Sequence, residues 1–439
     1  MRNKYLKLSA LILASAALFF AVYIITQKNP QQSISNYKTS VVYPTTPLTM
    51  SLWLPSDEAD GLHYIIDQYQ QIHPNVTVQA EVIDSASYQA RLVRAIAENN
   101  LPDMFVFRDD GLAVYRASLS PAPTAVFSAD TYNATFNSFG TKQLVSGNVI
   151  SGAPIGMATL GLLYNQSRFG QAGISSPPKT WVDFNNANDK LRQKSGDNLY
   201  QSGVALGTSA IHSYPDIISV LMMQNGATMT NQPPTKATFE QPDSAGYYSS
   251  AKAVSYYASF AQPSKSNYSW SDSLGDSIGA FAQNKTALII DYPMSAKLAY
   301  KQNPSLSVGL ASLPQTNTAS PINYGILLVG GVSKNSKTTD IAWDFWGFAT
   351  SKEVQKQFSL KSYWPPSRKD LTSEQQNDNV LSPFIAQSST ATDWFKGINY
   401  DTNGALREMM NNYLAGLDSQ VVVNNASTKV TGFIQQANK

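Results

Sequence analysis

The clearest candidates for ligand chemistry are polar residues at the end of a predicted strand. Residues 104–107 form an uninterrupted apolar run, and Arg108, Asp109 and Asp110 follow it directly. In open α/β sheets, ligands bind beyond the carboxyl ends of the strands. Carboxylate and guanidinium groups also make strong, charge-assisted hydrogen bonds. We therefore predict that these side chains contact a ligand; the alternative is a solvated loop cluster.

A second candidate set follows a later predicted strand. That strand covers residues 204–206, and Ser209, His212 and Tyr214 lie on the loop behind it. We expect this loop to face a cleft, where the imidazole of His212 could hydrogen-bond a hydroxyl group. The alternative for His212 is a structural role as a loop or capping histidine.

Aromatic residues near polar loops form a third set. Trp270 lies in the polar loop NYSWSDS, and Tyr292 comes just after a predicted strand at residues 285–290. An aromatic ring offers a flat apolar face with a polar edge. Such a face can stack on a flat part of a ligand, so both residues are candidates for ligand contact.

Enzymatic chemistry has no comparable support in the sequence. There is no G-x-S-x-G elbow, no H-E-x-x-H helix and no Walker lysine. The chain has no cysteine, and its histidines (His63, His73 and His212) are far apart, so disulfides are excluded and a metal site is not expected. A net charge of +2 without a lysine or arginine run argues against a nucleic-acid partner. We expect no catalytic residue, cofactor or metal.

The elements that must position these candidates follow an α/β pattern. A strand at residues 48–54, a helix at 62–72 and a strand at 76–83 open the folded part. A strongly amphipathic helix is expected over residues 340–358, where its aromatic side chains should pack in the core. A chain of 439 residues is long enough for more than one such unit.

The N-terminus has the pattern of a membrane-targeting segment. Arg2, Lys4 and Lys7 precede an apolar run of residues 8–25, which is near the ~20 residues needed to span a bilayer. We favour an uncleaved signal anchor in residues 1–26 that leaves the bulk of the chain exported. A signal peptide cleaved after the A-x-A pattern at Ala14 and Ala16 is the alternative. Residues 27–47 are polar and are expected to form a flexible linker.

One stretch resembles a known family over a long, ungapped match. Residues 153–184 read as strand, short helix, rigid turn and helix, with Thr180 as the N-cap of the last helix. The order of residues is similar to the crossover region of family 1 extracellular solute-binding proteins of the maltose-binding type. The matching residues are Pro154, Tyr164, Asn165, Phe169, Ala172, Gly173, Ile174, Pro177, Pro178, Thr180, Trp181, Asp183 and Phe184.

The resemblance implies a two-lobed α/β fold of the periplasmic-binding-protein type II, with discontinuous lobes joined by hinge strands. We expect residues 48–154 with 313–332 in the first lobe, and residues 155–312 with 333–439 in the second. It also implies a sugar or oligosaccharide ligand between the lobes and delivery to the membrane subunits of an ABC importer. The protein would sit outside the cytoplasmic membrane, tethered by its anchor or secreted. The alternatives are a membrane-tethered sensor or adhesin of the same fold, or a non-sugar solute.

The loop at residues 362–371 resembles a family loop that carries sugar-stacking aromatics, which adds Tyr363 and Trp364 to the candidates. The full set of predicted ligand-binding residues is Trp53, Arg108, Asp109, Asp110, Thr159, Ser209, His212, Tyr214, Trp270, Tyr292, Tyr324, Tyr363 and Trp364.

Overall fold

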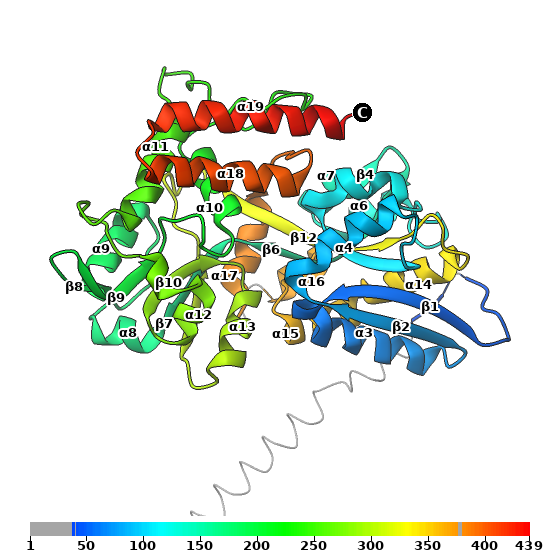
Figure 1. The fold of residues 1–439 in the computed structure, drawn as a ribbon. Helices are drawn as coiled ribbons and strands as arrows, with labels where there is room; N and C mark the ends of the chain where they lie inside the picture. The colour runs from blue at the N-terminus through cyan, green and yellow to red at the C-terminus, as the bar shows by residue number, and fades with distance from the viewer. Residues whose placement is uncertain (1–36, 40, 376–379) are drawn as a thin grey trace, which may run out of the picture.

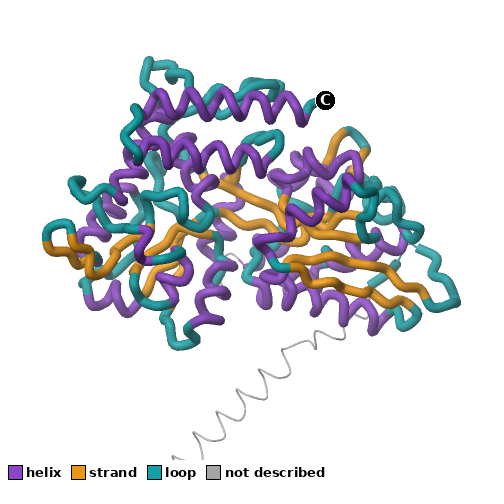
Figure 2. Tube along the Cα trace, in the orientation of Figure 1, coloured by secondary structure: helices purple, strands orange, loops and turns teal. Residues whose placement is uncertain are grey.

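The computed structural model describes residues 37–39, 41–375 and 380–439. It has two α/β lobes, each built around its own sheet, which lie side by side in Figure 1. Figure 2 shows the strands of both sheets in the interior with helices packed around them. The predicted fold class is confirmed.

The first lobe contains a sheet of six strands from the described part of the chain, in the order β13-β12-β3-β1-β2, with β6 also paired to β12. β1 is parallel to β2 and β3, whereas β12 is antiparallel to β3 and β6. The strands are β1 (Leu48–Pro55), β2 (Val76–Ile83), β3 (Met104–Arg108), β6 (Ala153–Thr159), β12 (Asn323–Val332) and β13 (Ala391–Thr392); a separate hairpin joins β4 (Val145–Ser146) and β5 (Val149–Ile150).

The second lobe contains a sheet with the order β11-β7-β10-β9-β8. β7 is antiparallel to β10 and β11, and β10 is parallel to β9. The strands are β7 (Gly161–Asn165), β8 (Gln193–Ser195), β9 (Asn198–Ala205), β10 (Thr286–Asp291) and β11 (Val308–Ser312).

Helices cover the outer faces of both sheets. Those associated with the first lobe are α3 (Ala59–Ile72), α4 (Ser85–Ala97), α5 (Leu112–Tyr115), α6 (Ala129–Thr135), α7 (Ser138–Leu144), α14 (Thr339–Ala349) and α15 (Lys352–Ser362). Those of the second lobe are α8 (Gln166–Gln171), α9 (Trp181–Leu191), α10 (Tyr214–Gln224), α11 (Ser249–Ala258), α12 (Ser277–Ala282), α13 (Met294–Gln302), α18 (Asn399–Leu414) and α19 (Ser419–Ala437). After α15 come α16 (Lys369–Gln375) and α17 (Ser382–Gln387); α17 contacts β6 of the first sheet and β11 of the second.

Local sequence signals account for most of these elements. Apolar residues alternate along β1, and Met50, Leu52 and Leu54 are fully buried. Thr180 caps α9 as predicted: its hydroxyl accepts the backbone N–H of Asp183, whose carboxylate accepts the N–H of Thr180. This reciprocal pair is a capping box, and it satisfies donors that a helix start otherwise leaves unpaired.

The apolar run at residues 154–163 is divided between the lobes. β6 pairs with β12 in the first sheet, β7 pairs with β10 in the second, and Leu160 lies between β6 and β7. The chain therefore passes from one lobe to the other at this point.

Close packing explains why β7 begins with a glycine. A Cβ atom on Gly161 would lie 2.5 Å from the ring of Phe384 and 2.7 Å from the carbonyl oxygen of Ala311.

The expected helix at residues 340–358 is two helices, α14 and α15, separated at Thr350 and Ser351. The Thr350 hydroxyl donates to the carbonyl oxygen of Trp346 at 2.8 Å, and the Ser351 hydroxyl donates to that of Phe348 at 2.7 Å. Hydroxyl groups that bond to the backbone in this way favour helix ends over helix interiors.

These two helices do not belong to the second lobe, where residues 333–439 were expected. α14 contacts β12, β6 and α3, and α15 contacts α3 and β6. The apolar face of α14 covers the first sheet through residues such as Trp346, whose indole N–H donates to the carbonyl of Gly331. The later helices α18 and α19 do pack against the second lobe: α18 contacts α10 and α11, and α19 contacts α11.

The expected flexible linker at residues 27–47 is docked where the structure describes it. Tyr37, Thr39 and Tyr43 all donate hydroxyl hydrogen bonds to the carboxylate of Asp344 in α14, at 3.2 Å from Tyr37 and 2.7 Å from Thr39. Asp344 is only 1% exposed. A buried carboxylate needs hydrogen-bond donors, and this segment supplies them.

The predicted signal anchor, residues 1–26, lies outside the described residues. Among the residues that are described, no helix is both long and apolar enough to cross a bilayer.

Candidate functional site

A cavity of about 310 Å³ lies where the lobes face each other. This volume is at the lower end of the ~300–1,000 Å³ typical of small-molecule sites. The first lobe and the segment behind α15 line it with Pro55, Asp57, Glu58, Ser85, Tyr88, Gln89, Leu92, Val106, Phe107, Arg108, Asp110, Gly111, Tyr115, Ile326, Leu328, Ser362 and Trp364. The second lobe lines it with His212, Ser213, Tyr292, Met294, Ser295, Lys297, Leu298, Asn399 and Asn403.

The ends of two parallel strands supply the polar groups of the first-lobe wall. β1 ends at Pro55 and is followed by Asp57 and Glu58, whereas β3 ends at Arg108 and is followed by Asp110. Because β1 and β3 are neighbours, these groups meet at one edge of the sheet. The rule that ligands bind at carboxyl ends of strands thus describes this wall.

Glu58 is a buried carboxyl group in that wall. Its Oε2 accepts the indole N–H of Trp364 at 2.7 Å. Burial raises the pKa of Glu58 to about 7, although the hydrogen bond from Trp364 and the charge of Lys297 act in the opposite direction. Trp364 is 2% exposed and its ring packs on Gly156, so little of the ring surface is left for stacking on a ligand.

His212 belongs to the second-lobe wall, and its orientation is set by Asp291 at the end of β10. His212 Nδ1 lies 2.8 Å from Asp291 Oδ2, and the Ser213 hydroxyl donates to Asp291 Oδ1 at 2.8 Å. The charge of Asp291 raises the pKa of His212. The half-exposed imidazole is therefore held in place at the cavity wall.

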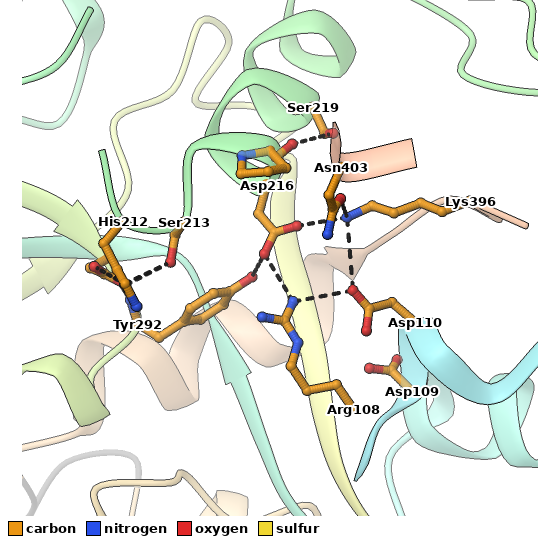
Figure 3. A network of polar contacts seen from close by, with 12 residues as sticks. Arg108, Asp109, Asp110, His212, Ser213, Asp216, Ser219, Tyr292, Lys396 and Asn403 are labelled. Carbon is orange, nitrogen blue, oxygen red and sulfur yellow. Dashed lines mark hydrogen bonds and ion pairs between the residues drawn. The ribbon is translucent and has the colours of Figure 1, made fainter. Parts of the chain in front are cut away.

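A buried polar network joins the two lobes next to the cavity (Figure 3). Arg108 Nη2 of the first lobe lies 2.9 Å from Asp216 Oδ2 of α10, and the Tyr292 hydroxyl donates to the same oxygen at 2.9 Å. Lys396 Nζ donates to Asp216 Oδ1 at 2.8 Å and lies 3.8 Å from Asp110 Oδ2. Burial alone would raise the pKa of Asp216, but Lys396 and Arg108 together lower it below its usual value. Asp216 is therefore ionised and paired across the lobes.

Asp109 points away from the cavity and into the first lobe. Its Oδ1 accepts the backbone N–H of Leu327 at 2.8 Å, and the residue is 5% exposed. Burial, Asp393 and Asp110 raise the pKa of Asp109 well above its usual value. Burial and Asp110 likewise raise the pKa of Asp393 to about 6. This pair of acidic residues packs beside the network rather than in the cavity wall.

The structure brings together part of the predicted set. Arg108, Asp110, His212, Tyr292 and Trp364 all line the cavity. They come from the end of β3 and the turn after it, the loops before α10 and α13, and the loop after α15. Polar residues at strand ends were the most useful signal, because Arg108, Asp110 and Tyr292 all follow or end buried strands.

Other predicted residues have partners elsewhere. Tyr214 is fully buried and donates to the carbonyl of Leu406 at 2.9 Å, and Trp270 is fully buried in the core of the second lobe. Ser209 donates to Asn411 Oδ1 at 2.6 Å. Their sequence positions on polar loops did not reveal that helix α18 and the core cover them.

The remaining predicted residues also lie outside the cavity wall. The guanidinium carbon of Arg91 lies 4.3 Å from the centroid of the Trp53 ring. The Thr159 hydroxyl accepts a hydrogen bond from the side-chain amide of Gln387 at 3.0 Å. Tyr324 is fully buried, with Lys396 Nζ 5.3 Å from its ring centroid. Tyr363 ends α15 in a left-handed conformation with a φ of 64°.

The sequence analysis missed several lining or supporting residues. Asp57 and Glu58 follow β1, so the strand-end rule that selected Arg108 could have found them. No local signal marks Asp216 and Lys396, because their partners lie 108 and 180 residues away in the sequence. Within the described ranges, no group of three or more histidine or acidic side chains is placed to hold a metal ion.

Solved structures with the same fold are solute-binding proteins. An ABC transporter solute-binding protein from Thermotoga lettingae, bound to α-D-tagatose, is 20% identical with a TM-score of 0.73, over 88% of this chain and 99% of that one. The GacH receptor of Streptomyces glaucescens, solved unliganded and with acarbose, is 17% identical with a TM-score of 0.71, over 89% and 99%. Maltose-bound MalE3 from T. maritima is 13% identical with a TM-score of 0.72, over 88% and 99%. At these identities the likeness shows the fold.

No curated protein matches the sequence. The family model described as bacterial extracellular solute-binding protein matches residues 64–382, well over half of the chain. This match confirms the kind of protein that the resemblance in the sequence implied. The chain therefore belongs to the bacterial extracellular solute-binding proteins, which bind solutes outside the cytoplasm and do not convert them.

Proposed function

We propose that this protein captures a sugar or oligosaccharide in the cavity between its lobes and delivers it to an ABC importer. The observation that carries the proposal is the inter-lobe cavity itself, walled by charged and hydroxyl groups from both lobes. A ligand that contacts both walls favours the conformation in which they are close. The solved structures of the same fold with α-D-tagatose, acarbose and maltose support a saccharide.

The chemistry of the wall suits a neutral polyhydroxylated ligand. Carboxylates at Asp57, Glu58 and Asp110 accept hydrogen bonds from hydroxyl groups, and Arg108 and Lys297 donate them. A micromolar dissociation constant corresponds to only about −8 kcal/mol. A few charge-assisted hydrogen bonds and the exclusion of water from a small cavity can supply that free energy.

Isothermal titration calorimetry with α-D-tagatose, maltose and acarbose tests the proposal. We expect at least one of these sugars to bind, and Arg108→Met to weaken its binding about 10- to 100-fold, because an ionic hydrogen bond is worth about 1.5–3 kcal/mol. Arg94→Met is the matched control, since Arg94 is exposed on α4 and pairs only loosely with Glu98 at 3.9 Å. Binding of a peptide or polyamine with no heat from any sugar would reject a saccharide ligand.

We also propose that the apolar run at residues 8–25 tethers the protein to the outer face of the cytoplasmic membrane. Its length and the basic residues before it support this placement. Replacing residues 1–26 by a cleavable signal peptide should move the protein from the membrane fraction to the soluble extracytoplasmic fraction. Equal recovery of both versions in the soluble fraction would mean that the natural segment is cleaved.

A further inference from the structure

The Arg108 guanidinium forms two ion pairs, one with a residue of each lobe. Its Nη2 atom lies 2.9 Å from Asp216 Oδ2 of the second lobe and 3.4 Å from Asp110 Oδ2 of its own lobe. Its Nε atom is buried and has no hydrogen-bond partner in the described part of the chain. Nη2 thus bridges the lobes at the cavity wall, while Nε is left for a further partner.

Asp216 in turn is held from several directions. Lys396 donates to its Oδ1 at 2.8 Å, and Tyr292 donates to its Oδ2 at 2.9 Å. The Lys396 ammonium also reaches Asn403 Oδ1 at 3.2 Å, and its side chain is fully buried. Because both carboxylate oxygens are engaged, Asp216 cannot rotate without breaking one of these contacts, and it offers Arg108 a fixed acceptor (Figure 3).

Helix stability alone does not explain this arrangement. An acidic residue in the first turn of α10 could stabilise the helix by interacting with its dipole, and it could do so from a position exposed to water. Asp216 is instead 3% exposed, and its partners come from β3, from the loop before α13 and from the segment before α18. Buried ion pairs are often no more stable than apolar residues of the same size, so a role in geometry is the better account.

We propose that Asp216 and Lys396 are positioning residues for binding: they hold Arg108 at the junction of the lobes, so that the group offered to the ligand also joins the two halves. Closing the lobes and presenting Arg108 then become one event. The part of this inference that concerns the ligand rests on the proposed function. The part that concerns the lobes does not, because the Arg108–Asp216 pair joins residues of the two lobes directly.

The distance between the lobes tests the second part directly. The chain has no cysteine, so spin labels can be placed at Val93→Cys on α4 and Val182→Cys on α9, where the native side chains are 44% and 69% exposed. Pulsed electron–electron double resonance should give one narrow distance distribution for the otherwise unchanged protein without sugar. In Lys396→Met, and in Asp216→Asn, the distribution should broaden or move to longer distances.

The double variant Asp216→Asn/Lys396→Met separates positioning from simple stability. It removes both charges, so no buried charge is left unpaired. If the residues only stabilise the fold, the double variant should recover both the melting temperature and the original distance distribution. We expect the melting temperature to recover while the distribution stays broad. The opposite result, or a broad distribution in the parent protein, overturns the inference.

Calorimetry with α-D-tagatose, maltose and acarbose tests the first part. Lys396→Met should weaken the binding of these sugars at least about tenfold, because Asp216 is then no longer held in place as the acceptor for Arg108. Lys429→Met is the matched control and should leave binding unchanged. Lys429 lies 2.6 Å from Glu408 of α18, and both side chains are about half exposed. Sugar binding that is equal in Lys396→Met and the parent contradicts the positioning role. If the parent binds none of the sugars, the proposed function fails, and the distance measurement still decides whether Asp216 and Lys396 hold the lobes together.

Discussion

Glu58 shows how burial changes the chemistry of a single residue. Its carboxyl group lies in the cavity wall with one strong donor, the indole of Trp364, and has a pKa of about 7. Near neutral pH it therefore exists in both forms. As a carboxylate it accepts hydrogen bonds only, whereas as an acid it can also donate one.

This pKa predicts a pH-dependent stability. Glutamate in the unfolded chain titrates near 4.3, so the folded protein binds the proton more tightly between that pH and about 7. The contribution of Glu58 is thus fully present below about pH 4.3 and is lost progressively as the pH rises from there through 7. Glu58→Gln, which mimics the protonated form, should match the parent below about pH 4. At pH 8 it should be more stable by up to about 4 kcal/mol, because one pKa unit corresponds to about 1.4 kcal/mol.

Urea unfolding at a series of pH values measures this difference. Glu98→Gln, at the exposed C-terminal end of α4, is the matched control. A constant difference between Glu58→Gln and the parent from pH 5 to pH 8 would show that Glu58 does not titrate in this range.

At the scale of elements, the segment before β1 behaves as part of the first lobe. Tyr43 stacks on His73 with ring centroids 4.1 Å apart, and Tyr37 packs edge-on against Phe348 at 5.3 Å. The hydroxyl groups of this segment satisfy the buried Asp344 carboxylate. Tyr37, Thr39 and Tyr43 are therefore held against the first lobe.

Tyr43→Phe tests this docking, because it removes one hydroxyl donor from Asp344 and keeps the ring. We expect a loss of about 1–3 kcal/mol in the free energy of unfolding, as for other hydrogen bonds to a buried charge. Tyr200→Phe is the control, since Tyr200 is 70% exposed on β9. Equal stability of both variants would mean that the segment is not held by Asp344 in solution.

At the scale of the whole molecule, contacts of different strength join the lobes. In the Arg108–Asp216 pair the Asp216 side chain is 4% exposed and that of Arg108 is 39% exposed, while Gln89 of α4 donates to Asn399 of α18 at 2.9 Å. Lys297 of α13 lies 2.9 Å from Asp60 of α3, but Asp60 is 58% exposed. Water and salt screen an exposed carboxylate, so we expect the Arg108–Asp216 pair, whose carboxylate is buried, to contribute more to the relation between the lobes.

Asp60→Asn checks this ranking. An exposed ion pair contributes about 0–1 kcal/mol, so the variant should change the melting temperature little, and less at high salt than at low salt. The distance between spin labels on the two lobes should stay the same. A broadened distribution in Asp60→Asn, comparable with that of Asp216→Asn, would show that the exposed pair matters as much as the buried one.

The sequence by itself determined the local elements and the kind of molecule they build. Alternating apolar residues specified β1, helical spacing specified α3, and Thr180 with Asp183 specified the start of α9. Their positions after a buried strand were enough to predict that Arg108 and Asp110 line a cavity. Such signals work because backbone propensity, capping and amphipathic spacing act within a few residues of each other.

Only the tertiary structure decided which polar and aromatic side chains meet. Trp270 and Tyr214 follow polar loops in sequence, yet the packing of the second lobe buries them completely. Lys396 has no distinguishing neighbours in sequence, yet it reaches Asp216 across 180 residues. Whether a side chain lines a cavity or lies beneath it depends on segments that meet only when the lobes have formed, and no local pattern records that meeting.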